Sequence, residues 1–122
     1  MSRILVVEDD VDMRELYLDL LTEMGHEAVG ASDGVSGLEL AETLKPELVI
    51  SDWRMPRMDG AELCKQLRRD DRFRDTRIIL HSSEGTPVSQ HADMCLRKLS
   101  DPEGFRRMVE TALSATRIED VA

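Results

Sequence analysis

Short apolar runs alternate along the chain with segments in which apolar residues recur at helical spacing. The runs predict five strands, at residues 4–7, 27–31, 48–51, 78–80 and 94–96. The periodic segments predict helices at residues 13–24, 34–45, 61–69 and 102–113. Strands that alternate with helices indicate a parallel sheet covered by helices on both faces. The pattern therefore predicts an α/β domain.

Residues with strong preferences for helix ends mark the predicted boundaries. Asp33 and Asp101 are candidate N-caps, and Pro102 suits the first helical position. Gly25 and Pro46 are expected to end the first two helices. The first helix is expected to direct one apolar stripe inward, formed by Met13, Leu16, Tyr17, Leu20, Leu21 and Met24.

Residues 84–93 interrupt the alternation where a fourth helix would complete it. This segment contains Gly85, Pro87 and Ser89 and only scattered apolar residues. Such a composition favours a short turn or an irregular loop over a full helix.

A chain of 122 residues is long enough to bury a core as one domain. We expect a single domain over residues 1–122, with its core at about 4–118 and a frayed tail after Ile118. Lys and Arg total 16 and Asp and Glu total 25, so the net charge is −9. This balance argues against nucleic acid and membrane surfaces as partners, because both attract clustered positive charge.

The cysteines and histidines show no metal-binding spacing. Cys64 and Cys95 are far apart in the sequence, and His26, His81 and His91 form no pair at ligand spacing. No signal peptide or membrane-spanning segment is evident, so we expect a reduced, cytoplasmic protein with Cys64 in the core.

Acidic residues follow two of the predicted buried strands. Glu8, Asp9 and Asp10 come directly after the first apolar run, and Asp52 follows the third. Carboxylates gathered in one pocket require a cation, and Mg²⁺ prefers such oxygen ligands. The pattern predicts a Mg²⁺ site containing an aspartate nucleophile. Asp10 is either a further ligand or a helix cap, and capping is favoured.

Two more polar residues stand at strand ends. Ser82 ends the fourth strand and Lys98 follows the fifth. In an open parallel sheet, ligands bind at the carboxyl ends of the strands. We therefore expect both side chains to lie near Glu8, Asp9 and Asp52.

These residues, together with the motif Asp52-Trp-Arg-Met-Pro-Arg-Met-Asp-Gly, resemble response-regulator receiver domains, and chemotaxis-type receivers especially. Receivers are the phosphoacceptor part of two-component systems. The resemblance covers roughly residues 4–113. It implies a flavodoxin-like three-layer α/β/α sandwich with strand order 2-1-3-4-5, here with the fourth helix truncated or missing.

The resemblance also implies a metal site. Asp9 and Asp52 would ligate Mg²⁺ directly, the backbone carbonyl of Arg54 would be a third ligand, and Glu8 would act through water. Asp59 is expected to shape a turn and a helix start.

The same resemblance implies a phosphorylation reaction. Asp52 would accept a phosphoryl group from a sensor histidine kinase or a histidine phosphotransfer protein. Lys98 would balance charge on the phosphoryl oxygens, and Ser82 would hydrogen-bond the group and report its presence to a downstream protein target. The protein would not be a metabolic enzyme, although it would catalyse its own phosphorylation and dephosphorylation.

The sequence is compatible with more than one function. The leading one is a stand-alone response regulator; the alternatives are a receiver fragment of a larger regulator and a pseudo-receiver scaffold that binds partners without phosphorylation. A phosphatase of the aspartate-nucleophile type would need an acid two residues after Asp52, and Arg54 occupies that position.

Three departures from the receiver pattern lie on one side of the domain. Lys98 stands 16 positions after Ser82, which is roughly six residues, or about 1.7 helical turns, shorter than usual. Cys95 replaces the usual aromatic switch residue, and Leu99 replaces the usual cis-proline. A trans Lys98–Leu99 bond and a shifted lysine are therefore expected.

These departures predict an atypical output face. The signal would pass by another route, such as an order–disorder change in residues 85–92. Arg54 and Glu84 occupy positions that tune the lifetime of the phosphorylated state in receivers. An ion pair between them would obstruct attacking water, with Ser83 adding crowding.

Overall fold

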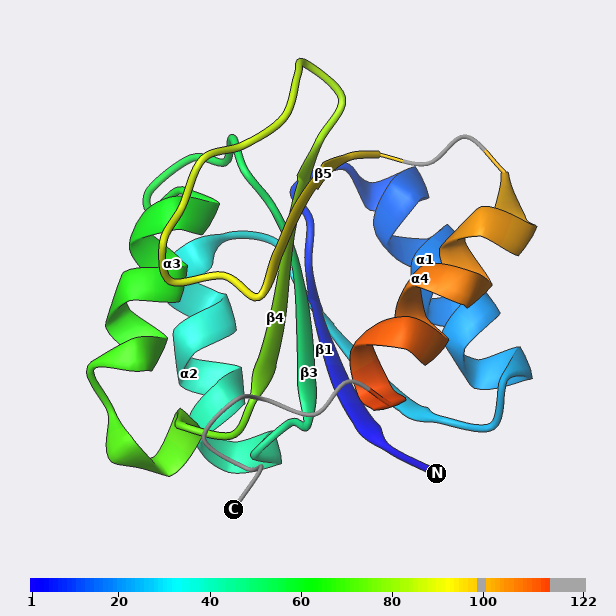
Figure 1. Cartoon of the computed structure of the whole chain (residues 1–122), viewed down its shortest axis with the longest axis horizontal. Coiled ribbons are helices and arrows are strands. Elements are labelled where there is room, and N and C mark those ends of the chain that lie inside the picture. Colours follow the sequence, from blue (N-terminus) through cyan, green and yellow to red (C-terminus); the bar gives the residue numbers. More distant parts are fainter. Residues whose placement is uncertain (99–100, 115–122) are drawn as a thin grey trace.

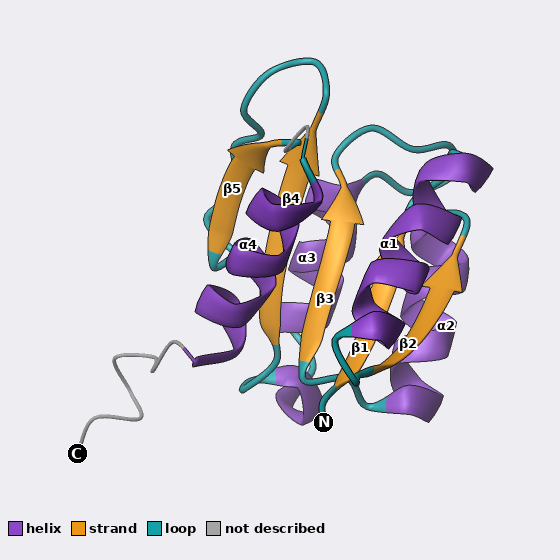
Figure 2. Cartoon of the chain, turned by 90° about the vertical axis from the view of Figure 1, so that its right-hand side faces the viewer, coloured by secondary structure: helices purple, strands orange, loops and turns teal. Residues whose placement is uncertain are grey.

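The computed structural model describes residues 1–98 and 101–114 and contains one parallel sheet. Its strands are β1 (Arg3–Val7), β2 (Glu27–Ala31), β3 (Leu48–Asp52), β4 (Arg77–Ser82) and β5 (Met94–Arg97). They pair in the order β2-β1-β3-β4-β5, and all four pairings are parallel (Figure 2). This confirms the predicted flavodoxin-like fold and strand order, and it places all carboxyl ends of the strands at one edge.

Helices cover both faces of the sheet. They are α1 (Val11–Glu23), α2 (Gly34–Leu44), α3 (Gly60–Arg68), a 3-10 turn η1 (Asp71–Phe73) and α4 (Pro102–Ser114). Helices α1 and α4 lie on one face, and α2 and α3 lie on the other (Figure 1). No helix in the described part of the chain is both long and apolar enough to cross a bilayer.

Each strand contributes alternate side chains to two separate cores, because successive strand residues point to opposite faces. Ile4 and Val6 pack against α1 and α4, whereas Leu5 and Val7 pack against α2 and α3. The central strands are therefore apolar on both sides, which explains the continuous runs in the sequence.

Aspartate N-caps begin the helices at the expected places. Asp33 accepts a hydrogen bond from the Ser36 amide at 2.8 Å. Asp10, Asp59 and Asp101 make the equivalent bonds in α1, α3 and α4. Each cap stabilises its helix by about 1 kcal/mol. The capping roles expected for Asp10 and Asp59 are thereby confirmed.

One detail of the sequence prediction was wrong. Leu16 was expected on the inner face of α1, but 44% of its surface is exposed. Helix α1 begins at Val11, two residues before the first apolar residue of the predicted stripe, and α3 begins at Gly60, one residue from the expected start. The predicted Lys98–Leu99 bond geometry and the frayed tail after Ile118 lie outside the described residues.

Residues 83–93 form a loop without helix between β4 and β5, as the composition predicted. Arg68 of α3 ties the far end of this loop to the domain. Its guanidinium donates to the His91 carbonyl at 2.9 Å and to the Asp93 carboxylate at 2.7 Å. It also donates to the carbonyls of Phe73 and Thr76 at 3.0 and 2.8 Å. A single arginine thus organises the backbone on the side where the helix is missing.

The two cysteines are free thiols in different settings. Cys64 is fully buried in the core, as expected, and burial raises its pKa to about 12. Cys95 lies half-buried on β5, with its Sγ 3.7 Å from the Ser89 carbonyl of the loop.

We predict that Arg68→Ala lowers the free energy of unfolding by about 2–4 kcal/mol, because it removes the ion pair with Asp93 and three hydrogen bonds to main-chain carbonyls. Chemical denaturation measures the effect. Arg69→Ala is the matched control, since Arg69 is exposed and its side chain makes no hydrogen bond or ion pair within the described residues. Equal stability of the two variants would contradict the role of Arg68.

Candidate functional site

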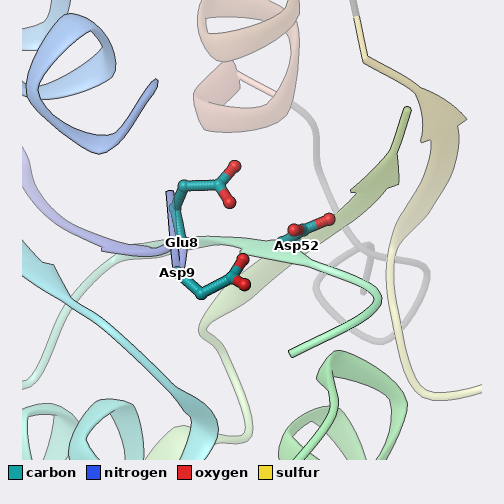
Figure 3. A group of neighbouring side chains, drawn as sticks. All are labelled: Glu8, Asp9 and Asp52. Atoms are coloured by element: carbon teal, nitrogen blue, oxygen red, sulfur yellow. The ribbon is translucent and has the colours of Figure 1, made fainter. Parts of the chain in front are cut away.

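Three carboxyl groups meet where β1 and β3 end (Figure 3). Glu8 and Asp9 follow β1, and Asp52 is the last residue of β3. The pairing of Val7 with Ser51 sets these strand ends side by side. One oxygen from each carboxylate lies within 4.8 Å of the others. Glu8 and Asp52 are 1% and 8% exposed, whereas Asp9 is open to solvent.

Lys98 places one positive charge among these acids. Its Nζ lies 2.6 Å from Glu8 Oε1 and 3.6 Å from Asp52 Oδ2. The lysine is held there because its backbone amide donates to the Ser82 carbonyl at 2.9 Å. Ser82 is itself buried, and its Oγ accepts from the Glu84 amide at 3.1 Å.

These groups surround one open pocket of about 350 Å³ at the carboxyl edge of the sheet. Its lining comprises Glu8, Asp9, Asp10, Met13, Asp52, Arg54, Ser82, Ser83, Glu84 and Lys98. The structure thus brings together every side chain that the sequence assigned to the site.

The site holds more negative charge than its lysine can balance. Glu8, Asp9 and Asp52 carry three negative charges when ionised against one positive charge on Lys98, a net of −2. The pKa of Glu8 is raised to about 7, mainly by burial and also by the nearby Asp52 charge, although Lys98 opposes both effects. Burial likewise raises the pKa of Asp52 against the opposing charge of Lys98. The pKa of Lys98 is lowered by burial but raised overall by its contacts with the two carboxylates.

A divalent cation matches this donor set. Mg²⁺ binds carboxylate oxygens, keeps several of its waters and needs only a few protein ligands. Two buried acids and one exposed acid supply those oxygens at one end of an open pocket, which leaves room for water and a substrate. Within the described residues, this is the group of three acidic, histidine or cysteine side chains close enough to hold a metal ion.

The histidines stand apart from this cluster. His81 is buried on β4 beside Tyr17, with ring centroids 5.5 Å apart. Burial lowers its pKa to about 3, with the Lys98 charge adding to the effect, so it is neutral. His26 and His91 lie elsewhere, as the sequence suggested.

The expected pairing of Arg54 with Glu84 is not formed. Both residues line the pocket, but no ion pair joins them within the described residues. The Arg54 guanidinium instead lies over the Trp53 ring, 4.3 Å from its centroid. Stacking on an adjacent aromatic ring competes with an exposed ion pair, which contributes little.

Sequence reasoning missed two arginines that brace the site. Arg57 adopts a left-handed φ of 69° and binds the Asp33 carboxylate at 3.1 Å, which fixes the loop after β3. Arg14 donates to the Glu8 carbonyl at 2.7 Å. A glycine inside β2, Gly30, was the available signal for Arg14, because an unexplained strand glycine often marks a close approach.

The raised pKa of Glu8 predicts that metal-free stability falls with rising pH. Because its folded pKa of about 7 exceeds the ordinary 4.5, the folded protein binds more protons than the unfolded chain between these values. Stability is therefore lost as pH rises through this window. In EDTA, Glu8→Gln should match the wild type near pH 4.5 and exceed it by about 2–3 kcal/mol above pH 7.

Urea denaturation at several pH values measures this difference. Glu15→Gln, which removes an exposed carboxylate from α1, should show no such pH-dependent gain. A Glu8→Gln curve parallel to the wild type across the window would contradict the shifted pKa.

Comparisons with known proteins agree with this geometry. Residues 4–110 match the response regulator receiver domain family. The chain is 38% identical over 85 residues to chemotaxis protein CheY1 of Helicobacter pylori, covering 68% of each protein. It is 35% identical over 85 residues to the DNA-binding dual master transcriptional regulator RpaA of Synechocystis sp., covering 70% of the chain but only 35% of that protein.

The fold of this chain is also similar to that of a solved structure. The response regulator TrrA of Thermotoga maritima, crystallised in complex with Mg²⁺ and BeF, is 30% identical with a TM-score of 0.80, covering 93% of this chain and all of that one (100%). The match covers nearly the whole chain. The chain therefore belongs to the response regulator receiver domain family.

Proposed function

We propose that this chain accepts a phosphoryl group on Asp52 in a Mg²⁺-dependent reaction and signals by phosphorylation-dependent binding of a protein partner. The observation that carries the proposal is the position of the Asp52 carboxylate, in the lining of a pocket that also contains Glu8, Asp9 and Lys98. The crystallisation of TrrA with Mg²⁺ and BeF supports the metal and phosphoryl assignments.

The donor would be a phosphohistidine on a sensor kinase or a phosphotransfer protein. An oxygen of the Asp52 carboxylate attacks phosphorus, the P–N bond breaks, and the histidine imidazole leaves with the bonding electron pair. The backbone amide of Trp53 holds Asp52 Oδ1 at 2.9 Å, so the carboxylate is oriented before the donor arrives. Phosphoryl transfer needs mainly such positioning and the neutralisation of charge.

Charge neutralisation is divided between the metal and Lys98. Asp9 and Asp52 would bind Mg²⁺ directly, with the Arg54 carbonyl and a water held by Glu8 completing the protein's contribution. The bound ion supplies positive charge to the phosphoryl oxygens. Lys98, which lies 3.6 Å from Asp52 Oδ2, would move from Glu8 to the new phosphoryl group.

Ser82 would connect phosphorylation to the output face. Its Oγ accepts the hydrogen bond of the Glu84 amide, the second residue of the β4–β5 loop. A hydroxyl drawn toward the phosphoryl group would release that amide. The other end of the loop is held by Arg68, so the change would be confined to the residues between.

The protein would act as a stand-alone regulator in the cytoplasm, without direct contact to nucleic acid or membrane. A scaffold without phosphorylation is the competing function, favoured by the half-buried Cys95 and the helix-free loop. A receiver that forms part of a larger regulator would use the same chemistry, as the partial coverage of RpaA illustrates.

We predict one added phosphoryl group on the wild type, and none on Asp52→Asn, after incubation with acetyl phosphate and Mg²⁺. Intact mass spectrometry measures the adduct. Asp59→Asn is the matched control, since Asp59 caps α3 and should leave phosphorylation unchanged. No adduct on the wild type would leave the scaffold function, and an adduct on Asp52→Asn would exclude Asp52 as the acceptor.

We also predict that phosphorylation accelerates amide hydrogen exchange at Glu84 and through residues 85–92, because the Ser82 contact is withdrawn. Mg²⁺ with beryllofluoride serves as the stable phosphoryl analogue. Asp52→Asn treated in the same way should show no change. Exchange in this loop that is indifferent to the analogue would contradict the proposed output route.

A further inference from the structure

Arg14 contacts the acidic site through the main chain. Its Nη1 donates to the Glu8 carbonyl oxygen at 2.7 Å, in a partly buried position. That carbonyl belongs to the planar peptide unit that joins Glu8 to Asp9. The Arg14 guanidinium therefore helps to set the orientation of the backbone from which the Asp9 side chain extends.

The neighbouring hydrogen bonds involve other groups than the Glu8 carbonyl, so Arg14 is the side chain that orients the Glu8–Asp9 peptide unit. The Glu8 amide is held by the Ala31 carbonyl at 3.0 Å, which continues the β1–β2 ladder by one residue. The Asp10 amide donates to Glu8 Oε2 at 3.3 Å, beyond the peptide in question. Asp9 is exposed, and within the described residues its carboxylate accepts no hydrogen bond. Because no such bond fixes the carboxylate, the backbone sets the range of positions that it can reach relative to Asp52.

Gly30 of β2 provides the space for this contact. A Cβ at this position would lie 3.0 Å from Arg14 Cδ and 3.0 Å from Leu18 Cδ1. Its φ is not left-handed, so the backbone does not require glycine. A glycine inside a strand costs about 0.5–1 kcal/mol relative to alanine. Room for the Arg14 side chain is a physical reason for its presence.

We propose that Arg14 is a positioning residue for the cation site: it orients the Glu8–Asp9 peptide, in space left by Gly30, so that Asp9 meets the metal together with Asp52. This inference rests on the proposed Mg²⁺ site. It assigns a role to a side chain that neither lines the pocket nor ligates the ion.

Electrostatics and positioning predict opposite effects of removing Arg14. Without it the net charge becomes more negative than −9, and long-range attraction would strengthen Mg²⁺ binding. Loss of positioning weakens binding instead, since groups that orient metal ligands typically contribute about 10–100-fold to affinity. The sign of the change therefore separates the two explanations.

The experiment is a Mg²⁺ titration of the full chain, in which binding is measured by Trp53 fluorescence and by isothermal titration calorimetry. Arg14→Ala should bind Mg²⁺ about tenfold more weakly than the wild type. Arg69→Ala, with the same loss of charge on an exposed side chain, should bind as tightly as the wild type or slightly more tightly. Thermal unfolding in EDTA confirms that each variant is folded.

A second variant tests the same contact with every charge retained. Gly30→Val puts two methyl groups into the space near Arg14 Cγ and Cδ and should weaken Mg²⁺ binding in the same direction. The double variant with Gly30→Val and Arg14→Ala should bind Mg²⁺ little more weakly than Gly30→Val alone, because both substitutions remove the same contact between Arg14 and the Glu8 carbonyl.

The outcomes distinguish the role of Arg14 from the existence of the Mg²⁺ site. Mg²⁺ binding by the wild type with unchanged or tighter binding by Arg14→Ala overturns the role of Arg14 and leaves the metal site standing. Absence of Mg²⁺ binding by the wild type overturns the metal site and the role of Arg14 with it. Weakened binding by both Arg14→Ala and Gly30→Val, with Arg69→Ala unaffected, supports the proposal.

Discussion

The site depends on the close approach of three carboxyl groups at the ends of two parallel strands. One oxygen each of Glu8, Asp9 and Asp52 lies within 4.8 Å of the others, and Lys98 is the cation that forms ion pairs with this cluster in the described part of the chain. Parallel pairing of β1 with β3 sets the backbone positions at these strand ends, which keeps the buried Glu8 and Asp52 close together. Binding a proton or a cation reduces the repulsion between them. Burial raises the pKa values of Glu8 and Asp52, and the charge of a neighbouring carboxylate adds to each shift, so proton uptake is one response and Mg²⁺ binding would be the other.

The strands and helix caps were predictable from the sequence, whereas several side-chain contacts around the site were not. Apolar runs that end in acids, such as Ile4 to Val7 before Glu8, identify strands and their carboxyl ends, because burial on both faces requires continuous apolar sequence. The aspartate caps were also recognisable, since their chemistry is local. Arg54 stacking on Trp53 was not predictable, because the side-chain conformation decides between several nearby partners.

Long-range arginine contacts escaped prediction for the same reason. Arg68 belongs to an ordinary charged helix end in the sequence, yet it holds the loop that replaces a helix. Periodicity reports which face of a helix is buried, but it does not report what a long polar side chain reaches. The acidic pocket is therefore formed even though residues 83–93 are a loop without helix.

A divalent cation would relieve the repulsion at this site. The most direct test compares the melting temperature in MgCl₂ and in NaCl of equal ionic strength, for the wild type and for Asp9→Asn. Mg²⁺ at about 100 times its Kd should stabilise the wild type by about 2.7 kcal/mol, which raises its melting temperature by several degrees, and Asp9→Asn should lose most of this gain. Equal effects of the two salts on the wild type would contradict cation binding at this site.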